Sequence, residues 1–522
     1  MRAAPLAAAL VLAAASAGAQ SLAIGLATAP TAIDPHYHAH AQNSATATHV
    51  FETLHAPDHL MQLQPRLARE ATTIDGRVWE IRLREGVRWH DGTPFTADDV
   101  AFSLHRAGNV PNSPGSYGTY TREIGTVEVT GPHSLRITAR APAPLLMSNL
   151  SNIFIVSRRH GEGAGTEDYN SGRAMVGTGP YRFARWSPGT EIHFTRNDTH
   201  WEAPQPWERV GFRVVTNPPA RVAALLSGDV DLIADVPSSD VARLAADRRF
   251  QLFTVSSNRL VFLGFDRTDA ALATGLIRAA EGAPALTANP LGDVRVRRAL
   301  SMAIDRRAIV ERINEGQAIA TGQFLPEGFF GHFPDIPVEP HDPDGARRLL
   351  AEAGYPNGFR LTLATSNDRI VNAARQVQAI AQMWSRIGVA TVVEMMPHAV
   401  FTPRRNRYEL PVFLSSWGNQ TGEPLYTLVP QLGTRSRETG LGAANRIRYS
   451  NAELDRLLVA AGAELDRGRR LALLRQATDL ALSEAVMQPL LLQVNNWGAR
   501  QGLAMVPRID QYTLAMSVRP AD

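Results

Sequence analysis

Residues 83–100 read Leu-Arg-Glu-Gly-Val-Arg-Trp-His-Asp-Gly-Thr-Pro-Phe-Thr-Ala-Asp-Asp-Val, and they indicate a strand that turns into a helix. Residues 79–84 alternate apolar and charged side chains, which predicts a half-buried strand. The turn has Gly92 after Asp91, and glycine tolerates the positive φ that tight turns need. Thr96 and Asp99 have the spacing of a capping box, so a helix is expected to begin there. A chain that joins strands to helices in this way is of the mixed α/β class.

Similar signals recur further along the chain. Asp342 is placed to cap a helix that ends near Gly354. Ser450 and Glu453 repeat the capping-box spacing, and residues 371–387 carry apolar side chains at helical intervals. No fixed repeat relates these segments, which argues against a solenoid or propeller.

Length and composition describe a multidomain globular protein. The chain has 522 residues, enough for two or three domains, with 44% hydrophobic and 20% charged residues. It contains no lysine, so its 53 basic residues are all arginine, and the formal net charge is only +3. Basic runs interleaved with aromatic residues are absent, so a nucleic-acid partner is not expected.

The N-terminus predicts export. Arg2 precedes an apolar run over residues 6–15, and Ala17-Gly18-Ala19 forms a cleavage signal, so residues 1–19 are predicted to be a signal peptide. No later segment approaches the roughly 18 apolar residues of a membrane span. The chain has no cysteine, hence neither disulfides nor the lipid-anchored cysteine of a lipoprotein. We expect a periplasmic protein, with release to the medium as the alternative.

Six motifs in sequence order carry a resemblance to a known family. The chain resembles the extracellular solute-binding proteins of family 5 that serve ABC transporters, the group of oligopeptide, dipeptide and nickel binders. The motifs are Ala32-Ile33-Asp34-Pro35, residues 83–100, Val176-Gly177-Thr178-Gly179-Pro180-Tyr181, residues 294–305, Ala351-Glu352-Ala353-Gly354-Tyr355-Pro356 and Tyr449-Ser450-Asn451.

The resemblance implies a two-lobed α/β fold of the periplasmic-binding-protein type II, in its three-domain variant, with a hinge between the lobes. The implied limits are 20–45, 174–257 and 488–522 for lobe 1 (domain I), 46–173 for an inserted domain II, and 258–487 for lobe 2 (domain III). Residues 260–265 and 490–495 would cross between the lobes.

The same resemblance implies the function. The protein would capture a small polar solute, a peptide or a peptide-like molecule, by closing its lobes, and would deliver it to the permease and ATPase subunits of an inner-membrane importer. Relatives act as monomers, so a monomer is expected, and no cofactor is implied. Closure excludes water and thereby strengthens each polar contact to the solute.

One segment of lobe 2 departs from the peptide-binder pattern W-x-x-D-x-x-D-P. Here it reads Trp417-Gly418-Asn419-Gln420-Thr421-Gly422-Glu423-Pro424. Gln420 replaces the Asp that neutralises a peptide ammonium, and glutamine cannot neutralise a charge. Either Glu423 supplies the charge or the ligand presents no ammonium here; a purely structural Glu423 is the third reading. We predict Trp417, Asn419, Gln420 and Glu423 as ligand-binding residues.

Arginine is the side chain best suited to a carboxylate, because its planar fork bonds both oxygens. Arg369, in a loop before a helix, lies close to the arginine of dipeptide binders, although the alignment is loose. Arg404 is the second predicted ligand residue, beside Arg405, and Arg446 is a third candidate. Trp497 is predicted to stack on the solute, and Tyr117 and Tyr120 are candidates for covering it, each with a structural role as the alternative.

The N-terminal segment offers Tyr37 and His38 as predicted contacts at the mouth of the cleft. His36, His38 and His40 would lie on one face of a strand and could meet one metal, so a nickel-type metal complex is the alternative ligand. The absence of a neighbouring carboxylate disfavours it, and no metal site is predicted.

An exported hydrolase is the remote alternative. The chain lacks G-x-S-x-G, H-E-x-x-H and S-x-x-K signatures, and Asp91 and Asp99 are explained by the turn and the helix start. No catalytic residue is predicted.

Overall fold

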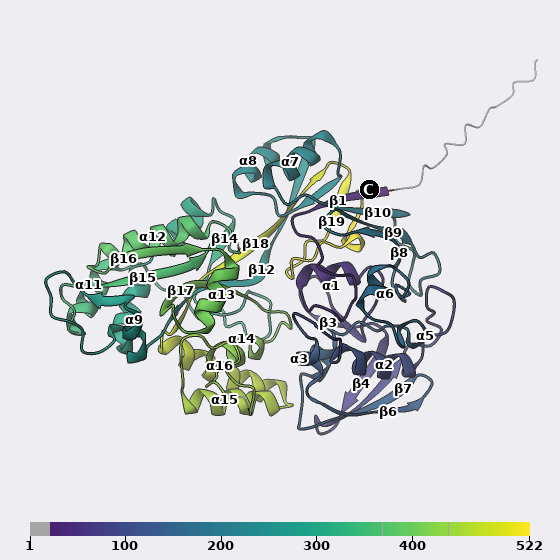
Figure 1. Ribbon diagram of the computed structural model, residues 1–522, viewed down its shortest axis with the longest axis horizontal. Helices are drawn as coiled ribbons and strands as arrows, with labels where there is room; N and C mark the ends of the chain where they lie inside the picture. The colour runs from purple at the N-terminus through teal and green to yellow at the C-terminus, as the bar shows by residue number, and fades with distance from the viewer. Residues whose placement is uncertain (1–20, 368, 437, 522) are drawn as a thin grey trace, which may run out of the picture.

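The computed structural model describes residues 21–367, 369–436 and 438–521. The predicted signal peptide, residues 1–19, lies outside the described residues. Figure 1 shows two parts side by side, joined by two long strands, β12 (Phe250–Phe265) and β18 (Met487–Arg500). We keep the names lobe 1, inserted domain and lobe 2 for the ranges given above; these limits stay a prediction.

A twelve-stranded sheet runs through both lobes of the described chain, and β12 and β18 lie at its centre. On the lobe 1 side it continues through β11 (Leu232–Ala234), β1 (Ser21–Leu26), β10 (Arg209–Val214), β9 (Glu191–Arg196) and β8 (Tyr181–Ser187). On the lobe 2 side it continues through β17 (Val412–Gly418), β15 (Phe359–Ser366) and β13 (Ile277–Ala279), while β16 (Ala390–Met396) pairs with β15 and β14 (Ala318–Ala320) with β18.

Three smaller sheets complete the strands. The inserted domain holds a four-stranded sheet in the order β4 (Ala68–Thr73), β5 (Val78–Leu83), β7 (Ser134–Ala139), β6 (Ile124–Gly131), and the hairpin β2 (His55–Pro57) with β3 (Leu63–Pro65). Near the C-terminus, β19 (Leu503–Met505) pairs with β20 (Val518–Pro520).

Helices cover the sheets in each part (Figure 1). The N-terminal half has α1 (Ala41–Ala47), α2 (Ala97–Ala107), α3 (Gly118–Thr121), α4 (Leu146–Leu150), α5 (Arg158–Gly161), α6 (Thr166–Asn170), α7 (Pro218–Ser227) and α8 (Ser238–Ala246). Lobe 2 has α9 (Val294–Met302), α10 (Arg306–Ala308), α11 (Pro343–Glu352), α12 (Ala373–Ser385), α13 (His398–Asn406), α14 (Leu425–Leu432), α15 (Ala452–Ala463) and α16 (Arg467–Ser483).

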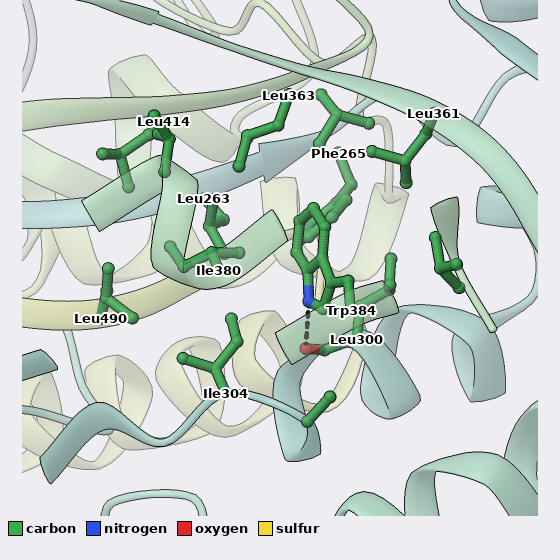
Figure 2. Packing of buried hydrophobic residues seen from close by; sticks show 14 of the residues in the cluster. Leu263, Phe265, Leu300, Ile304, Leu361, Leu363, Ile380, Trp384, Leu414 and Leu490 are labelled. Atoms are coloured by element: carbon green, nitrogen blue, oxygen red, sulfur yellow. Dashed lines mark hydrogen bonds between the residues drawn. The ribbon is translucent and has the colours of Figure 1, made fainter. Parts of the chain in front are cut away.

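Each part has its own apolar core. In lobe 2 the indole of Trp384 on α12 packs against residues of β12 and β15, and its Nε1 donates to the Leu300 carbonyl at 2.8 Å (Figure 2). A buried indole N–H needs such a partner, so this bond fixes α12 against α9. The four-stranded sheet packs β5 and β7 against α2 around Trp89 and Phe95.

Residues of the family-like motifs connect the inserted domain to lobe 1. His90, in the turn before α2, donates from Nε2 to the Gly179 carbonyl at 3.0 Å and accepts the Gly177 N–H at Nδ1, 3.2 Å away. A Cβ at Gly177 would lie 1.7 Å from the Val50 carbonyl oxygen, so only glycine fits there. The inserted domain is thereby fastened to lobe 1 through two sequence motifs.

The helix starts follow the predicted caps with one exception. The Asp99 carboxylate accepts the Thr96 N–H at 2.9 Å where α2 begins, and Asp342 accepts the Gly345 N–H at 2.7 Å at the start of α11, so both predictions are confirmed. The predicted capping box at Ser450 is wrong: α15 begins one residue later because the Asn451 side chain accepts the Glu453 and Leu454 N–H groups.

Candidate functional site

A cavity of about 340 Å³ lies mainly between lobe 1 and the inserted domain. Ser44 and Thr48 line it from α1, and the hairpin β2–β3 and residues 508–516 supply other walls. Gln420 is the wall residue from lobe 2. The position that departs from the peptide-binder pattern therefore reaches the enclosed space.

The four acidic side chains of the cavity wall already have partners in the protein. Glu52 pairs with Arg66 at 2.9 Å and also accepts from Trp201 Nε1 at 2.9 Å. Asp58 accepts from Gln64 Nε2 and from two backbone N–H groups. Glu202 pairs with Arg66, and Asp510 pairs with Arg508. Burial alone would raise the pKa of Glu52, but the contacts with His200 and Arg66 outweigh it and lower the pKa. Three of the four wall carboxylates are thus neutralised by arginines, and Asp58 is held by uncharged donors.

Asn419 orders the loop that presents Gln420. It is buried; Nδ2 donates to the Glu423 carbonyl at 2.8 Å, and Oδ1 accepts the Gly422 N–H at 2.9 Å. Its own N–H donates to the Asn258 carbonyl at 3.0 Å, which ties the loop to β12. These contacts occupy the Asn419 side chain within the protein.

Trp417 and Glu423 also contact the protein on either side of that loop. Trp417 is half-buried and donates from Nε1 to the Tyr426 carbonyl at 3.2 Å. Glu423 forms an ion pair with Arg470 at 2.7 Å, and burial raises the pKa of the Glu423 carboxyl to about 7. The structure brings Glu423 to Arg470 of α16 instead of to the cavity.

The histidines of the N-terminal segment do not converge on one point. His36 is buried and its Nε2 bonds the Phe154 carbonyl at 2.7 Å, whereas the rings of His38 and His40 stack with centroids 5.2 Å apart. Tyr37 is half-buried, and its carbonyl accepts the Ser113 hydroxyl. Across the described residues, no group of three His, Cys, Asp or Glu side chains could hold a metal ion.

The predicted arginines differ in their surroundings. Arg404 pairs with Glu394 and Glu409, so its charge is neutralised within lobe 2. Arg405 donates to the Ser415 hydroxyl at 2.6 Å, and Arg446 to the Asn406 side chain at 2.7 Å. Arg369 is exposed and has no carboxylate within 4.0 Å among the described residues.

Trp497 and the two loop tyrosines are buried. Trp497 belongs to the core of lobe 1 and donates from Nε1 to the Thr513 hydroxyl at 2.8 Å. Tyr120 and Tyr426 pack in the same apolar cluster, which joins the inserted domain to lobe 2, and Tyr117 contacts Ser44 at 3.4 Å. Tyr117 and Tyr120 therefore lie behind the cavity wall rather than over a ligand.

Comparison with known proteins decides the family. The family model described as bacterial extracellular solute-binding proteins, family 5 Middle, matches residues 62–438. The chain belongs to this family. It is therefore a solute-binding protein of the class that serves ABC import, and members of this class are binding proteins rather than enzymes.

Curated relatives of this family 5 protein include two with named ligands. The chain is 28% identical over 456 residues to heme-binding protein A of Haemophilus influenzae, covering 82% of this chain and 78% of the relative. It is also 28% identical over 473 residues to the glutathione-binding protein GsiB of Salmonella typhimurium, covering 89% and 87%.

Solved structures agree with the two-lobed, type II periplasmic-binding-protein fold. HbpA2 from Haemophilus parasuis superposes with a TM-score of 0.82 at 23% identity, covering 96% of this chain and 100% of that one. DppA from Helicobacter pylori, in complex with a peptide, gives a TM-score of 0.75 at 20% identity over 96% and 98%. The predicted fold class and family are confirmed.

Sequence reasoning missed Ser44 and Tyr512 of this family 5 protein. Ser44 and Tyr512 line the cavity from α1 and the C-terminal segment, which lie far apart in the chain. Neither residue belongs to one of the six motifs, so no sequence signal indicated it.

The described residues contain no helix long and apolar enough to cross a membrane.

Proposed function

We propose that this protein works in the periplasm, where it captures a small, polar, peptide-like solute between its lobes and delivers it unchanged to the permease and ATPase subunits of an ABC importer. The observation that carries the proposal is the cavity of about 340 Å³ where lobe 1, the inserted domain and Gln420 of lobe 2 meet. Enclosed sites with a few convergent polar groups are typical of small-molecule binding.

The side chains of the cavity wall limit which solutes can bind there. Three of the four acidic wall residues are paired with arginines, and Gln420 stands where peptide binders place an Asp. A buried ammonium without a carboxylate loses about 2–5 kcal/mol. We therefore favour a solute that does not direct a free α-ammonium at Gln420, and the glutathione-binding relatives make glutathione the first compound to test.

For the remaining predicted contacts, the proposal keeps Tyr37, His38, Arg369, Trp417 and Gln420 as ligand-binding residues. Asn419 is assigned the ordering of the Gln420 loop. Glu423 and Arg404 are assigned structural roles because each is ion-paired within the protein, and Trp497 because it lies in the apolar core of lobe 1.

The test begins with the native protein. Native mass spectrometry after purification without denaturation should reveal a co-purified solute, and calorimetry with glutathione, a neutral dipeptide and heme should show saturable one-to-one binding for one of them. The melting temperature should rise with that compound, because a ligand of the native state stabilises it. The solute should be recovered chemically intact.

Two results would contradict the proposal. Chemical conversion of the solute during incubation would indicate an enzyme. Binding that a chelator abolishes would favour the metal-complex alternative.

A further inference from the structure

The turn between β2 and β3 of the inserted domain, residues 58–62, borders both lobes; we call it the hairpin turn. Met61 of this turn is buried and lines the cavity. It also packs in one apolar cluster with Leu325 and Phe329 of lobe 2 and with Ile509 of lobe 1. One residue of the inserted domain thus lies against the cavity and against both lobes.

Lobe 1 holds the hairpin turn through polar contacts to its backbone. Arg508 Nη2 donates to the carbonyls of residues 57 and 58, at 3.1 and 3.2 Å. The Ile509 N–H donates to the His59 carbonyl at 3.0 Å. Hydrogen bonds from a charged donor are stronger than neutral ones. The hairpin turn is therefore fixed to lobe 1, and we expect it to stay with lobe 1 when lobe 2 moves.

The contacts of the hairpin turn with lobe 2 are weaker. Met61 packs against Leu325 and Phe329. Gln62 Nε2 donates to the Gly328 carbonyl at 3.4 Å, which is long for a hydrogen bond. Contacts of these kinds separate without leaving a buried charge behind, so this side of the turn is free to open.

The loop of lobe 2 that presents Gln420 also approaches the hairpin turn closely. A Cβ at Gly422 of that loop would lie 3.2 Å from the Met61 carbonyl oxygen, and Gly422 has a φ of +71°. Both features favour glycine at this position. Met61 and Gln420 both line the cavity, so the hairpin turn and the Gln420 loop form adjoining parts of its wall.

Met61 has a backbone conformation that residues other than glycine seldom adopt. Its φ is +63°, in the left-handed region. Asp58 imposes this conformation, because Oδ1 accepts the N–H groups of Leu60 and Gln62 at 2.9 Å and the Asp58 carbonyl accepts the Met61 N–H at 3.1 Å. Strained residues of this kind occur at ligand clamps and switch regions. Glycine would adopt this φ without strain, so a methionine here indicates a role for its side chain.

We propose that the hairpin turn is a latch that closes over the bound solute, with Met61 held between the solute and the Leu325–Phe329 surface of lobe 2. The proposal rests on the function proposed above, because it places the solute in the cavity beside Gln420. It gives the inserted domain a part in holding the solute. Methionine suits this position, since its flexible, polarizable side chain adapts to irregular apolar surfaces.

The latch couples solute binding to closure. When Met61 lies between the solute and lobe 2, water is excluded from both of its sides, and the apolar area removed from water is larger than for either contact alone. The solute therefore strengthens the contact with lobe 2, and lobe 2 strengthens the contact with the solute by the same factor. Because the solute enters before lobe 2 meets the hairpin turn, Met61 should act on release more than on entry.

Stopped-flow measurement of reduced glutathione binding and release tests the latch. Met61→Ala should release glutathione about tenfold faster, with entry changed less than about twofold. Met61→Leu keeps the apolar volume and should release it within about threefold of the wild-type rate. Leu63→Ala removes an exposed apolar side chain from the same hairpin and is the matched control, with wild-type release expected.

A double-variant cycle separates the latch from a simple wall contact of Met61. Phe329 is not among the described residues of the cavity wall, so Phe329→Ala should speed release only through the cluster that holds Met61. The double variant of Met61→Ala and Phe329→Ala should release glutathione no more than about twice as fast as Met61→Ala alone. Fully additive effects would make Met61 a wall residue and overturn the inference.

Pulsed electron paramagnetic resonance measures the latch without release kinetics. Nitroxides at Leu60→Cys and Glu327→Cys, both exposed positions, span the contact between the hairpin turn and lobe 2. With glutathione, the wild type should show a short distance whose share falls at least about threefold in Met61→Ala and persists in Leu63→Ala. No short distance in the wild type, with or without glutathione, or an unchanged share in Met61→Ala, would overturn the inference.

Unchanged release in both Met61→Ala and Phe329→Ala would also overturn it and leave the proposed function standing. Failure of the protein to bind any solute would be a failure of the proposed function, and the distances across the latch would still decide this inference.

Discussion

Gln420 is the side chain that lobe 2 contributes to the cavity wall. Because it is neutral, it cannot neutralise an ammonium group of the solute. Gln420→Asp restores the acidic residue of the peptide-binder pattern. We expect the variant to gain about tenfold or more in affinity for a dipeptide with a free α-ammonium, because an ammonium–carboxylate pair shielded from water is worth more than about 1.4 kcal/mol. Calorimetry with the dipeptide and its N-acetyl form measures the gain.

Gln420→Asn is the matched control and should bind neither peptide more tightly. If Gln420→Asp binds the free and the acetylated dipeptide equally, the ammonium does not reach this position.

His49 shows how a buried imidazole makes stability depend on pH. Its ring stacks on Phe194 with centroids 5.0 Å apart, Nδ1 donates to the Ala45 carbonyl, and Nε2 accepts the Ala515 N–H at 3.1 Å. These two bonds require the neutral form, and burial lowers the pKa of His49 to about 4. The unfolded chain has a histidine pKa of about 6.5, so it binds the proton first as the pH falls.

The stability that neutral His49 provides is therefore complete above pH ~6.5 and is lost as the pH falls toward 4, by up to about 3 kcal/mol. Urea unfolding at pH 7.5 and 4.5 should show a smaller loss of unfolding free energy for His49→Gln than for the wild type. His105→Gln, on the exposed side of α2, should leave the pH dependence unchanged. An equal loss in His49→Gln would exclude His49 as a source.

Between elements, Asp34 links the N-terminal segment of lobe 1 to the inserted domain. Its carboxylate is fully buried and accepts both Arg106 nitrogens, at 2.9 and 2.8 Å, as well as the Thr166 hydroxyl at 2.9 Å. Asp34→Asn leaves the Arg106 charge without its partner, which should lower the free energy of unfolding by about 3–5 kcal/mol. Chemical denaturation measures the change.

The double variant Asp34→Asn with Arg106→Gln tests the pair. It should be less destabilised than the two single changes added together, since neither leaves a buried charge behind. Additive effects would mean that Asp34 and Arg106 act independently.

These contacts between lobe 1 and the inserted domain explain why the fold class could be predicted from the sequence. Asp34, His90 and Gly177 belong to the motifs that carried the family resemblance, and each fixes one part of the fold to another through local, specific chemistry. Because those contacts depend on residue types at set spacings, the fold class followed from them. The start of α15 was misplaced by one residue because Ser450 and Asn451 are both good caps and only the backbone geometry separates them.

The site was harder to predict because its wall comes from distant segments. Ser44, Gln420 and Tyr512 line one cavity only after α1, the loop behind β17 and the C-terminal segment are folded together. Trp497 and Glu423 have the residue types of ligand contacts, yet Thr513 and Arg470 are their partners. Residue type and motif position alone do not say which partner a polar side chain finds.

For the whole molecule, lobe 2 touches both lobe 1 and the inserted domain. Asn372 Nδ2 of lobe 2 lies 3.4 Å from the Ser238 hydroxyl of lobe 1, and Met61 of the inserted domain's hairpin packs against Leu325 and Phe329 of lobe 2. Neither contact is large, and residues that absorb a hinge motion are few, so a lobe rotation about β12 and β18 would break both. We expect the ligand-free protein to populate an open form and the solute to favour the arrangement in Figure 1.

The absence of cysteine makes this motion measurable, because introduced thiols can be labelled selectively. Ser239→Cys and Val371→Cys place two exposed nitroxide labels beside the Ser238–Asn372 contact without altering it. Pulsed electron paramagnetic resonance should give one short, narrow distance distribution with saturating solute and a longer, broader one without it. Two labels on lobe 2, at Val371 and Val392, should give the same distribution in both samples. If the interlobe distances also stay the same, the solute enters without lobe movement.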